Sequence, residues 1–262
     1  MRRRWCIPVA ALALVGGSTL AFAGAAAASS AAPRSGQVRV QSGGSARLIR
    51  PFITVHGGRH AVFSSNWSGY AAHGGTYKNV SANWVEPKGH CSGSRHKYSS
   101  FWVGLDGYNS NSVEQTGSEV DCKGGTAKYY SWYEMFPKFP VKFSNTVRPG
   151  DHFHGSVTYN GGGRFTLKLS DTTRGWAHTA HKSLSSARRS SAEVIIEAPS
   201  SRHGVLPLAD FGTVHISNAK VNGSKIGKHR PTKIIMQSGG TRKDSVSGLT
   251  NGQNFSVTWH HS

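Results

Sequence analysis

The chain has 262 residues, enough for one sizeable domain together with processing segments, and 37% of them are hydrophobic. With 10% aromatic residues the chain has the material for a packed core, which argues against disorder along its whole length. The formal net charge of +19 raises the question of nucleic acid, but the basic residues are scattered and no zinc finger, helix-turn-helix or RNA-binding signature is present. We therefore expect no specific nucleic-acid partner, and expect non-specific attraction to polyanions such as cell-wall polymers.

The N-terminus has the three parts of a secretory signal peptide. A basic start, Arg2 to Arg4, precedes an apolar run from Ile7 to about Leu20 and two small-residue sites, 21–23 and 26–28. We expect residues 1–28 to be a signal peptide and the protein to be secreted. No later stretch approaches 18 consecutive apolar residues, so we expect no membrane span.

Residues 29–60 are rich in Ala, Ser, Gly and Arg and hold few large apolar side chains. Such a segment cannot bury much core, so we interpret it as a basic propeptide or flexible arm. An unprocessed disordered leader is the alternative. The folded domain is then expected over residues 61–262, with the mature chain beginning between about Arg59 and Ser65.

From Phe63 onward, short runs of β-branched and aromatic residues alternate with clusters of Gly, Asn, Ser and Pro. Turn signals stand at 148–151 (RPGD) and 160–163 (NGGG), and no long window carries a helical stripe. The sequence therefore predicts an all-β fold, a two-sheet antiparallel β-sandwich without an internal repeat. The expected strands include NVSANWVE, KYSSFWVGLD, AKYYSWYEMF, HFHGSVTY, RFTLKLS, AEVIIE, TKIIMQ and FSVTW.

Three cysteines occur, and Cys6 lies in the expected signal peptide. Cys91 and Cys122 remain as an even pair in an oxidising compartment, so we expect a disulfide between them, with two free thiols as the alternative. Closing a loop of roughly 30 residues stabilises the fold by about 3 to 4 kcal/mol in the chain-entropy description.

Carboxylates in the strand-like segment 191–199 (SAEVIIEAP) alternate with apolar residues. Side chains of a strand point to opposite faces in turn, so Glu193 and Glu197 share one face, while Val194 and Ile196 share the other. At about 3.3 Å per residue the two acids lie roughly 13 Å apart, too far to share a proton. We therefore expect them to have separate roles, with a solvated strand face as the alternative.

A second acid lies among aromatic residues in the segment 129–137 (YYSWYEMFP). The same alternation puts Trp132 and Glu134 on one face and Tyr133 on the other. An acid surrounded by so many aromatic side chains favours the wall of a cleft over open surface.

The common catalytic motifs are missing, since no HExxH, GxSxG, P-loop or GxGxxG occurs. Fourteen histidines raise the possibility of a metal. His152 and His154 would share a strand face, and His178 and His181 lie three apart, but no third ligand can be identified. We interpret these residues as surface histidines and expect neither a metal nor an organic cofactor. No Ser/His/Asp triad is singled out either.

Four blocks and one short motif, in their order and rough spacing, carry a resemblance to a known family. From about Asn66 to the C-terminus the sequence resembles the eqolisins, secreted glutamic endopeptidases that work with one Gln and one Glu. In the first block we expect an apolar strand followed by a polar loop that ends in Gln115. The segments are NWSGY (66–70), SFWVGLDGYNSNSVEQTG (100–117), YYSWYEMFP (129–137), SAEVIIEAP (191–199) and LADFGTVHI (208–216).

The resemblance implies a fold and a mode of activation. The sandwich would consist of two curved sheets in a lectin-like, jelly-roll type of arrangement, with the substrate in its concave cleft. A basic prosegment would cover the acidic active site of a zymogen, and the arginines of the expected arm fit that description. They are Arg34, Arg39, Arg47, Arg50 and Arg59.

Matched block by block, Gln115 corresponds to the catalytic glutamine at the end of the family's WVGIDG…LQTG pattern. Glu197 corresponds to the catalytic glutamate at the end of its AEWIVE strand. Two departures, Val194 in place of a Trp and YEMFP in place of YEWYP, put the subsite shape in doubt but not the catalytic pair. Further residues are expected to line or support the cleft, namely Trp102, Asp106, Trp132, Glu134 and Glu193.

The resemblance implies an acid-active endopeptidase that needs no cofactor. Glu197 would take the proton of a water molecule and return it to the leaving nitrogen, while the Gln115 amide would stabilise the oxyanion. The expected partners are protein or peptide substrates, and the expected state is a monomer. Two alternatives are a catalytically inert lectin-like module that binds carbohydrate or polyanions, and a structural surface protein. The presence of both Gln115 and Glu197 favours the enzyme.

Overall fold

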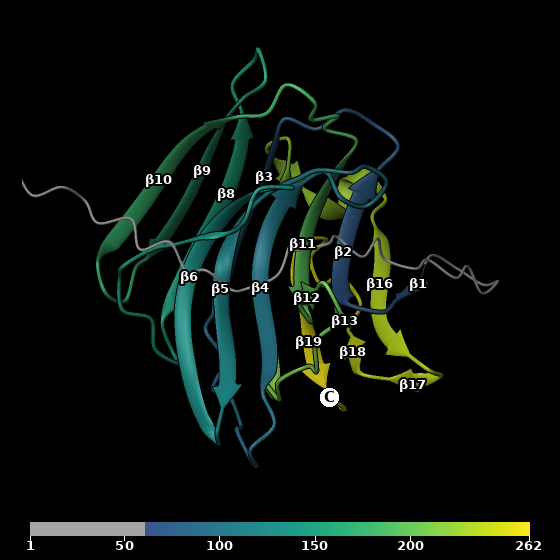
Figure 1. The fold of residues 1–262 in the computed structure, drawn as a ribbon. Helices are drawn as coiled ribbons and strands as arrows, with labels where there is room; N and C mark the ends of the chain where they lie inside the picture. The colour runs from purple at the N-terminus through teal and green to yellow at the C-terminus, as the bar shows by residue number, and fades with distance from the viewer. Residues whose placement is uncertain (1–60) are drawn as a thin grey trace, which may run out of the picture. The chain divides into compact units, whose positions relative to one another are not determined.

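The computed structural model describes residues 61–262. The expected signal peptide and basic arm, residues 1–60, lie outside the described residues. The described part forms two β-sheets packed face to face (Figure 1), which confirms the predicted all-β sandwich. Its one helical element is the 3₁₀ turn η1 (Ile226–His229), and no helix of this part is long and apolar enough to cross a membrane.

The first sheet has nine strands, in the order β1-β16-β2-β11-β4-β5-β6-β7, with β17 paired to β16. Its pairs are antiparallel except β1 with β16. In the turn after β1 the Ser64 hydroxyl accepts the backbone N–H groups of Asn66 and Trp67, and β16 lies between β1 and β2, parallel to one and antiparallel to the other. The bounds are β1 (Ala61–Ser64), β2 (Trp67–His73), β4 (Lys97–Leu105), β5 (Val113–Lys123), β6 (Thr126–Phe136), β7 (Val141–Lys142), β11 (Ser191–Glu197), β16 (Thr232–Ser238) and β17 (Thr241–Arg242).

The second sheet has eight strands, in the order β10-β9-β8-β3-β14-β19-β18, with β15 paired to β14. A separate two-stranded hairpin, β12 with β13, follows directly after β11. The bounds are β3 (Asn79–Val85), β8 (His152–Tyr159), β9 (Arg164–Asp171), β10 (Trp176–Ser183), β12 (Ser200–Ser201), β13 (Gly204–Val205), β14 (Thr213–Val221), β15 (Ser224–Lys225), β18 (Asp244–Val246) and β19 (Phe255–Trp259).

The predicted runs all fall on strands, but β5 corrects one expectation. We expected a polar loop ending in Gln115, whereas the strand begins at Val113 and Gln115 lies inside it. Pairing explains the difference, because β5 is hydrogen-bonded to β4 on one side and to β6 on the other. A central position in a sheet overrides the low strand propensity of Glu and Gln. The predicted turns are confirmed at Arg148, whose carbonyl accepts from Asp151, and at Gly161.

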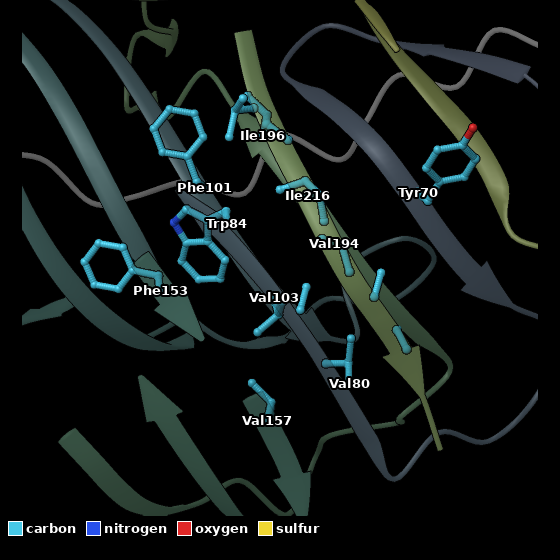
Figure 2. Close-up of a cluster of buried hydrophobic side chains, with 14 of the residues drawn as sticks. Tyr70, Val80, Trp84, Phe101, Val103, Phe153, Val157, Val194, Ile196 and Ile216 are labelled. Carbon is cyan, nitrogen blue, oxygen red and sulfur yellow. The ribbon is translucent and has the colours of Figure 1, made fainter. Parts of the chain in front are cut away.

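Alternate residues of both sheets build the core between them (Figure 2). Phe101 and Val194 come from the nine-stranded sheet, and Trp84 and Phe153 from the other. Burying each such side chain contributes about 1.5 to 3 kcal/mol, which fixes the face that every strand turns inward. Because Val194 and Ile196 face this core, their neighbours on β11 point to the outer face, as the predicted alternation requires.

The predicted disulfide is confirmed, and it has a measurable consequence. Cys91 and Cys122 are bonded across a sequence separation of 31 residues, which ties the segment before β4 to the end of β5. Cys91→Ser is expected to remove about 3 to 4 kcal/mol of stability and to lower Tm by about 10 °C. Thermal melts at pH 3 and pH 7 check this. An acid-compatible reductant should lower the Tm of the native protein and leave the variant unchanged; equal Tm values for the two proteins would contradict it.

Candidate active site

The outer face of the nine-stranded sheet carries a second apolar cluster, separate from the core between the sheets. Its aromatic side chains lie on neighbouring strands and surround a set of buried polar groups. The strands that supply it are therefore buried on both faces, although they belong to an antiparallel sheet. The cluster contains Val62, Trp67, Ala71, Trp102, Val113, Trp132, Phe136, Ile195 and Ile234, with Tyr108 and Tyr130 packed against it.

Gln115 and Glu134 are direct neighbours within this layer. They face each other across β5 and β6, and the Gln115 Nε2 donates to Glu134 Oε2 at 2.6 Å. Burial raises the pKa of Glu134 to about 8; the bond from Gln115 lowers this pKa and the charge of Glu197 raises it. The Gln115 Oε1 has no hydrogen-bond partner among the described residues. The amide is thus held in one orientation, with an acceptor left for another molecule.

Glu197, the last residue of β11, is half-buried and holds two donors. Trp102 Nε1 donates to its Oε2 at 2.9 Å, and Asn66 Nδ2 donates to its Oε1 at 3.2 Å. Burial raises the pKa of Glu197 to about 7, while Trp67, Trp102 and Asn66 act to lower it. Sequence analysis missed Asn66 as a site residue, and its only signal was its place in the NWSGY block.

The strand register shows how the two halves of this site are related. Gln115 lies opposite Gly104 on β4, while Glu197 lies opposite Ser100 on the same strand. Trp102 lies between these two positions, and its indole donates to Glu197. Gln115 and Glu197 make no direct hydrogen bond with each other in the described contacts. Glu134 interacts with both residues. It accepts a hydrogen bond from the Gln115 amide, and the charge of Glu197 raises its pKa.

Two glycines leave the space that Trp102 occupies. A Cβ on Gly104 would lie 2.9 Å from the Trp102 ring, and one on Gly117 would lie 2.6 Å from the Trp102 Cβ and 2.2 Å from the carbonyl oxygen of Phe101. Contacts that short force a neighbour to move. Glycine at both positions therefore lets the indole lie where it donates to Glu197.

Glu193 shares the outer face with Glu197, as predicted, but its surroundings differ. It is fully buried, and burial raises its pKa well above the usual range. The charges that raise this pKa further belong to Asp106 and Glu114, not to Glu197. Burial likewise raises the pKa of Glu114 to about 8. Glu114 was missed as a candidate residue, although it stands beside Gln115 in the first block.

Asp106 supports the fold around Glu193. It follows β4 directly with a φ of 70° and accepts the backbone N–H groups of Arg188, Arg189 and Ser190 at 2.6–2.9 Å. The Ser190 hydroxyl adds a fourth bond at 3.0 Å. These bonds fix the segment that leads into β11. Asp106 is thus placed to support the site rather than to contact Gln115 or Glu197.

Another polar group on the same face was missed by the sequence analysis. Glu119 lies opposite Tyr130, and burial raises its pKa well above the usual range, with the nearby Asp121 adding to the effect. The Lys142 Nζ lies 3.0 Å from the centre of the Tyr130 ring. The alternation of acids in SEVDC was the one available signal.

Histidines do not converge on a metal site in the part of the chain that the structure describes. Within residues 61–262 no group of three or more His, Cys, Asp or Glu side chains could hold a metal ion. His154 bonds Asn83 at 2.6 Å and His181 bonds Thr166 at 3.1 Å.

Comparison with known proteins finds matches that span nearly all of the described part. The sequence matches the Peptidase A4 family over residues 65–259. Aspergillopepsin-2 of Aspergillus niger is 27% identical over an alignment of 226 residues that covers 76% of this chain and 80% of that protein. A crystal structure of scytalido-glutamic peptidase with a transition state analog inhibitor is similar with a TM-score of 0.66 and 25% identity, covering 75% of this chain and 98% of that one. Aspergilloglutamic peptidase from Aspergillus niger has a TM-score of 0.57 and 26% identity over 63% of this chain and 99% of its own.

Proposed function

Because this chain belongs to the Peptidase A4 family, the eqolisins, and is thus a peptide hydrolase of the glutamic endopeptidase type, we propose that Gln115 and Glu197 are its catalytic pair. We further propose that the enzyme is secreted and works in acid. One observation carries the assignment of the pair. On a single sheet face, Glu134 fixes the Gln115 amide, and Trp102 and Asn66 hold the Glu197 carboxyl.

Each hydrogen-bonding group that this arrangement leaves free has a use in peptide hydrolysis. A primary amide has two N–H bonds, so Gln115 can give one to Glu134 and the other to the oxyanion that develops on the scissile carbonyl. Its unpartnered Oε1 can accept a hydrogen bond from the attacking water. The Glu197 carboxylate removes a proton from that water as its oxygen attacks the carbonyl carbon. It then returns the proton to the amide nitrogen as the C–N bond breaks, so no proton is gained or lost.

Glu197 is the group that carries the pH dependence, because the amide of Gln115 does not titrate. It can act as a base only after it has lost its proton, so the acid limb of kcat/KM belongs to this carboxyl. Burial raises the pKa of this carboxyl, and the hydrogen bonds from Trp67, Trp102 and Asn66 lower it. Glu134, whose pKa is about 8, keeps its proton in acid, so Glu197 can ionise without a second negative charge beside it. The donors that hold the Glu197 carboxylate lower its pKa below the value that burial alone would give, so each of them extends the active range toward acid.

Trp102→Phe tests this dependence. Loss of the indole donor is expected to raise the pKa of Glu197 and to move the acid limb of kcat/KM upward by about one pH unit, since a hydrogen bond to a charged group is worth about 1.5 to 3 kcal/mol. Trp132→Phe is the matched control, because it removes an indole N–H on the same face that has no hydrogen-bond partner within residues 61–262. The acid limb of the control should stay in place. An equal displacement in both variants, or none in either, would contradict the role given to Trp102.

The function itself is tested with the purified mature protein and a denatured protein substrate, at about pH 3 and at steps up to about pH 6, with and without pepstatin. We expect cleavage that pepstatin does not block. Inhibition by pepstatin would point to a different catalytic apparatus. A folded protein that cleaves nothing between about pH 3 and pH 6 would favour the inert lectin-like module. N-terminal sequencing of the exported form tests secretion, and a start near Gly24 or Ser29 with full activity would remove the propeptide.

A further inference from the structure

The outer face of the eight-stranded sheet points away from the core and from the face that holds Gln115 and Glu197. Core residues such as Val80, Phe153 and Phe165 mark the inward positions of its strands. The outward positions of β3, β8, β9, β10, β14 and β19 alternate with them. We call these outward positions the outer polar face. They are occupied mainly by Ser, Thr, Asn, His, Lys and Arg, and by no acidic residue and no Phe, Tyr or Trp.

No exposed acid elsewhere on the described surface offsets the positive charge of this face. Ten of the twelve acidic residues of the chain are buried, and Glu197 and Asp210 are half-buried. The ion pairs of the described residues involve Lys123 and Arg174, neither of which lies on the outer polar face. Its cationic side chains are therefore available to a partner.

One row across the sheet gives this face a defined shape. Lys168, Ser156, Ser81 and Lys220 are register partners on the successive strands β9, β8, β3 and β14. Both lysines are exposed, and the two serines between them are small and partly exposed. At about 4.8 Å per strand, the two lysine backbones lie roughly 14 Å apart. The row thus has a hydroxyl floor with a positive charge at each side.

The neighbouring row continues this arrangement along the strands. His154 lies beside Ser156 on β8, and its Nδ1 bonds the Asn83 side chain at 2.6 Å. Burial lowers the pKa of His154, and the charges of Lys168 and Lys220 lower it further. The positive charges of both lysines therefore reach His154, which lies on the strand between them.

We propose that the outer polar face binds an anionic polysaccharide, which lies along β8 and β3 between Lys168 and Lys220. The ammonium groups pair with carboxylate or sulfate groups of the polymer, and the hydroxyl, amide and imidazole side chains bind its sugar hydroxyls. A nucleic acid fits less well, because this face has no Phe, Tyr or Trp side chain to stack on a base. Binding here goes beyond the peptidase function and leaves the catalytic face open, so that the enzyme can act while attached to a polymer.

Retention on dextran sulfate beads at about pH 4 and low salt tests the proposal, with uncharged dextran beads and single-stranded DNA as comparison ligands. The native protein is expected to bind dextran sulfate in a salt-sensitive way and to ignore dextran. Lys168→Gln with Lys220→Gln should weaken binding by about fivefold or more, on ordinary values for exposed ion pairs. Lys168→Arg with Lys220→Arg keeps both charges and should retain binding. Hydrolysis of a soluble peptide should be unchanged in both double variants, which also shows that they fold.

The matched control is Lys88→Gln with Arg95→Gln, which removes two exposed charges from the segment between β3 and β4. It should bind within about twofold of the native protein, since both double variants have the same net charge. Equal weakening by the two pairs would show that net charge, not this face, attracts the polymer, and would overturn the proposal. Failure of the native protein to bind dextran sulfate, or tighter binding of single-stranded DNA, would overturn it as well.

Discussion

Glu197→Gln and Gln115→Ala are each expected to lower kcat/KM by at least about 100-fold while the protein remains folded. Loss of one oxyanion donor costs about 100-fold to 1000-fold, and loss of the only base should cost at least as much. Glutamine nearly matches glutamate in shape and can still accept a hydrogen bond from Trp102 or Asn66, so the fold should survive. Activity measured across the pH range and a thermal melt of each variant check both parts of this expectation.

Glu193→Gln is the matched control, because Glu193 lies on the same strand and the same face as Glu197. Its electrostatic neighbours are Asp106 and Glu114, so we expect partial activity with a displaced acid limb. A Glu197 or Gln115 variant that keeps more than about a tenth of the native rate would overturn the assignment of the pair. An inactive Glu193→Gln together with an active Glu197→Gln would exchange the roles of the two glutamates.

Stability is expected to be highest in acid and to fall as the pH rises from about 4.5 to about 8. Burial raises the pKa of Glu86, Glu114 and Glu134 from 4.5 to about 8. Each of these acids favours the folded state while it is protonated. That contribution is fully present below the pKa of the unfolded chain and is lost as the pH rises through the pKa of the folded protein. At roughly 1.4 kcal/mol per pKa unit, one such group removes about 5 kcal/mol by pH 8.

Several losses of that size together exceed a total free energy of unfolding of about 5 to 15 kcal/mol. Burial lowers the pKa of His73, His154 and His178. These histidines favour the folded state while they are neutral, so they lower the stability of the protein as the pH falls. The carboxyl groups should dominate, since their shifts are larger. Few ion pairs exist among the described residues, so protonating carboxylates in acid removes little stabilisation. We therefore expect the native protein to unfold between neutral and weakly alkaline pH.

Denaturant titrations at about pH 3, 5, 7 and 8.5 measure this dependence. Glu86→Gln is the informative variant, because Glu86 lies off the catalytic face and binds the Ser118 hydroxyl, which accepts Trp84 Nε1 at 2.8 Å. The substitution should leave the free energy of unfolding in acid nearly unchanged and raise it above that of the native protein at about pH 8. A native protein that is as stable at pH 8.5 as at pH 5 would show that these buried acids ionise without cost.

Local periodicity explains what the sequence could predict. The alternation in β11 placed Glu193 and Glu197 on one face, and the same rule separated Trp132 and Glu134 from Tyr133, because the two-residue period of a strand needs no knowledge of its neighbours. The disulfide followed from the number of cysteines and the expected compartment.

Contacts between segments that are distant in the sequence could not be predicted in this way. Asn66 and Glu197 are 131 residues apart, and only the pairing of β2 with β11 brings them together. The different surroundings of Glu193 depend in the same way on where β4 ends beside β11 and where β5 begins beside β4. The position of Gln115 within a strand also arose from pairing on both sides, which overrides local composition.

The close fit of Trp102 between Gly104 and Gly117 restricts how the cleavage preference of this enzyme can be re-engineered. Saturation mutagenesis at either glycine would displace the indole and remove its hydrogen bond to Glu197, so clones selected for activity in acid would retain glycine. Directed evolution has more freedom at the rim of the aromatic layer, at Phe136 and at the exposed Phe139 that follows it. A search for new specificities should therefore leave the middle of the sheet unchanged and diversify the chain after β6.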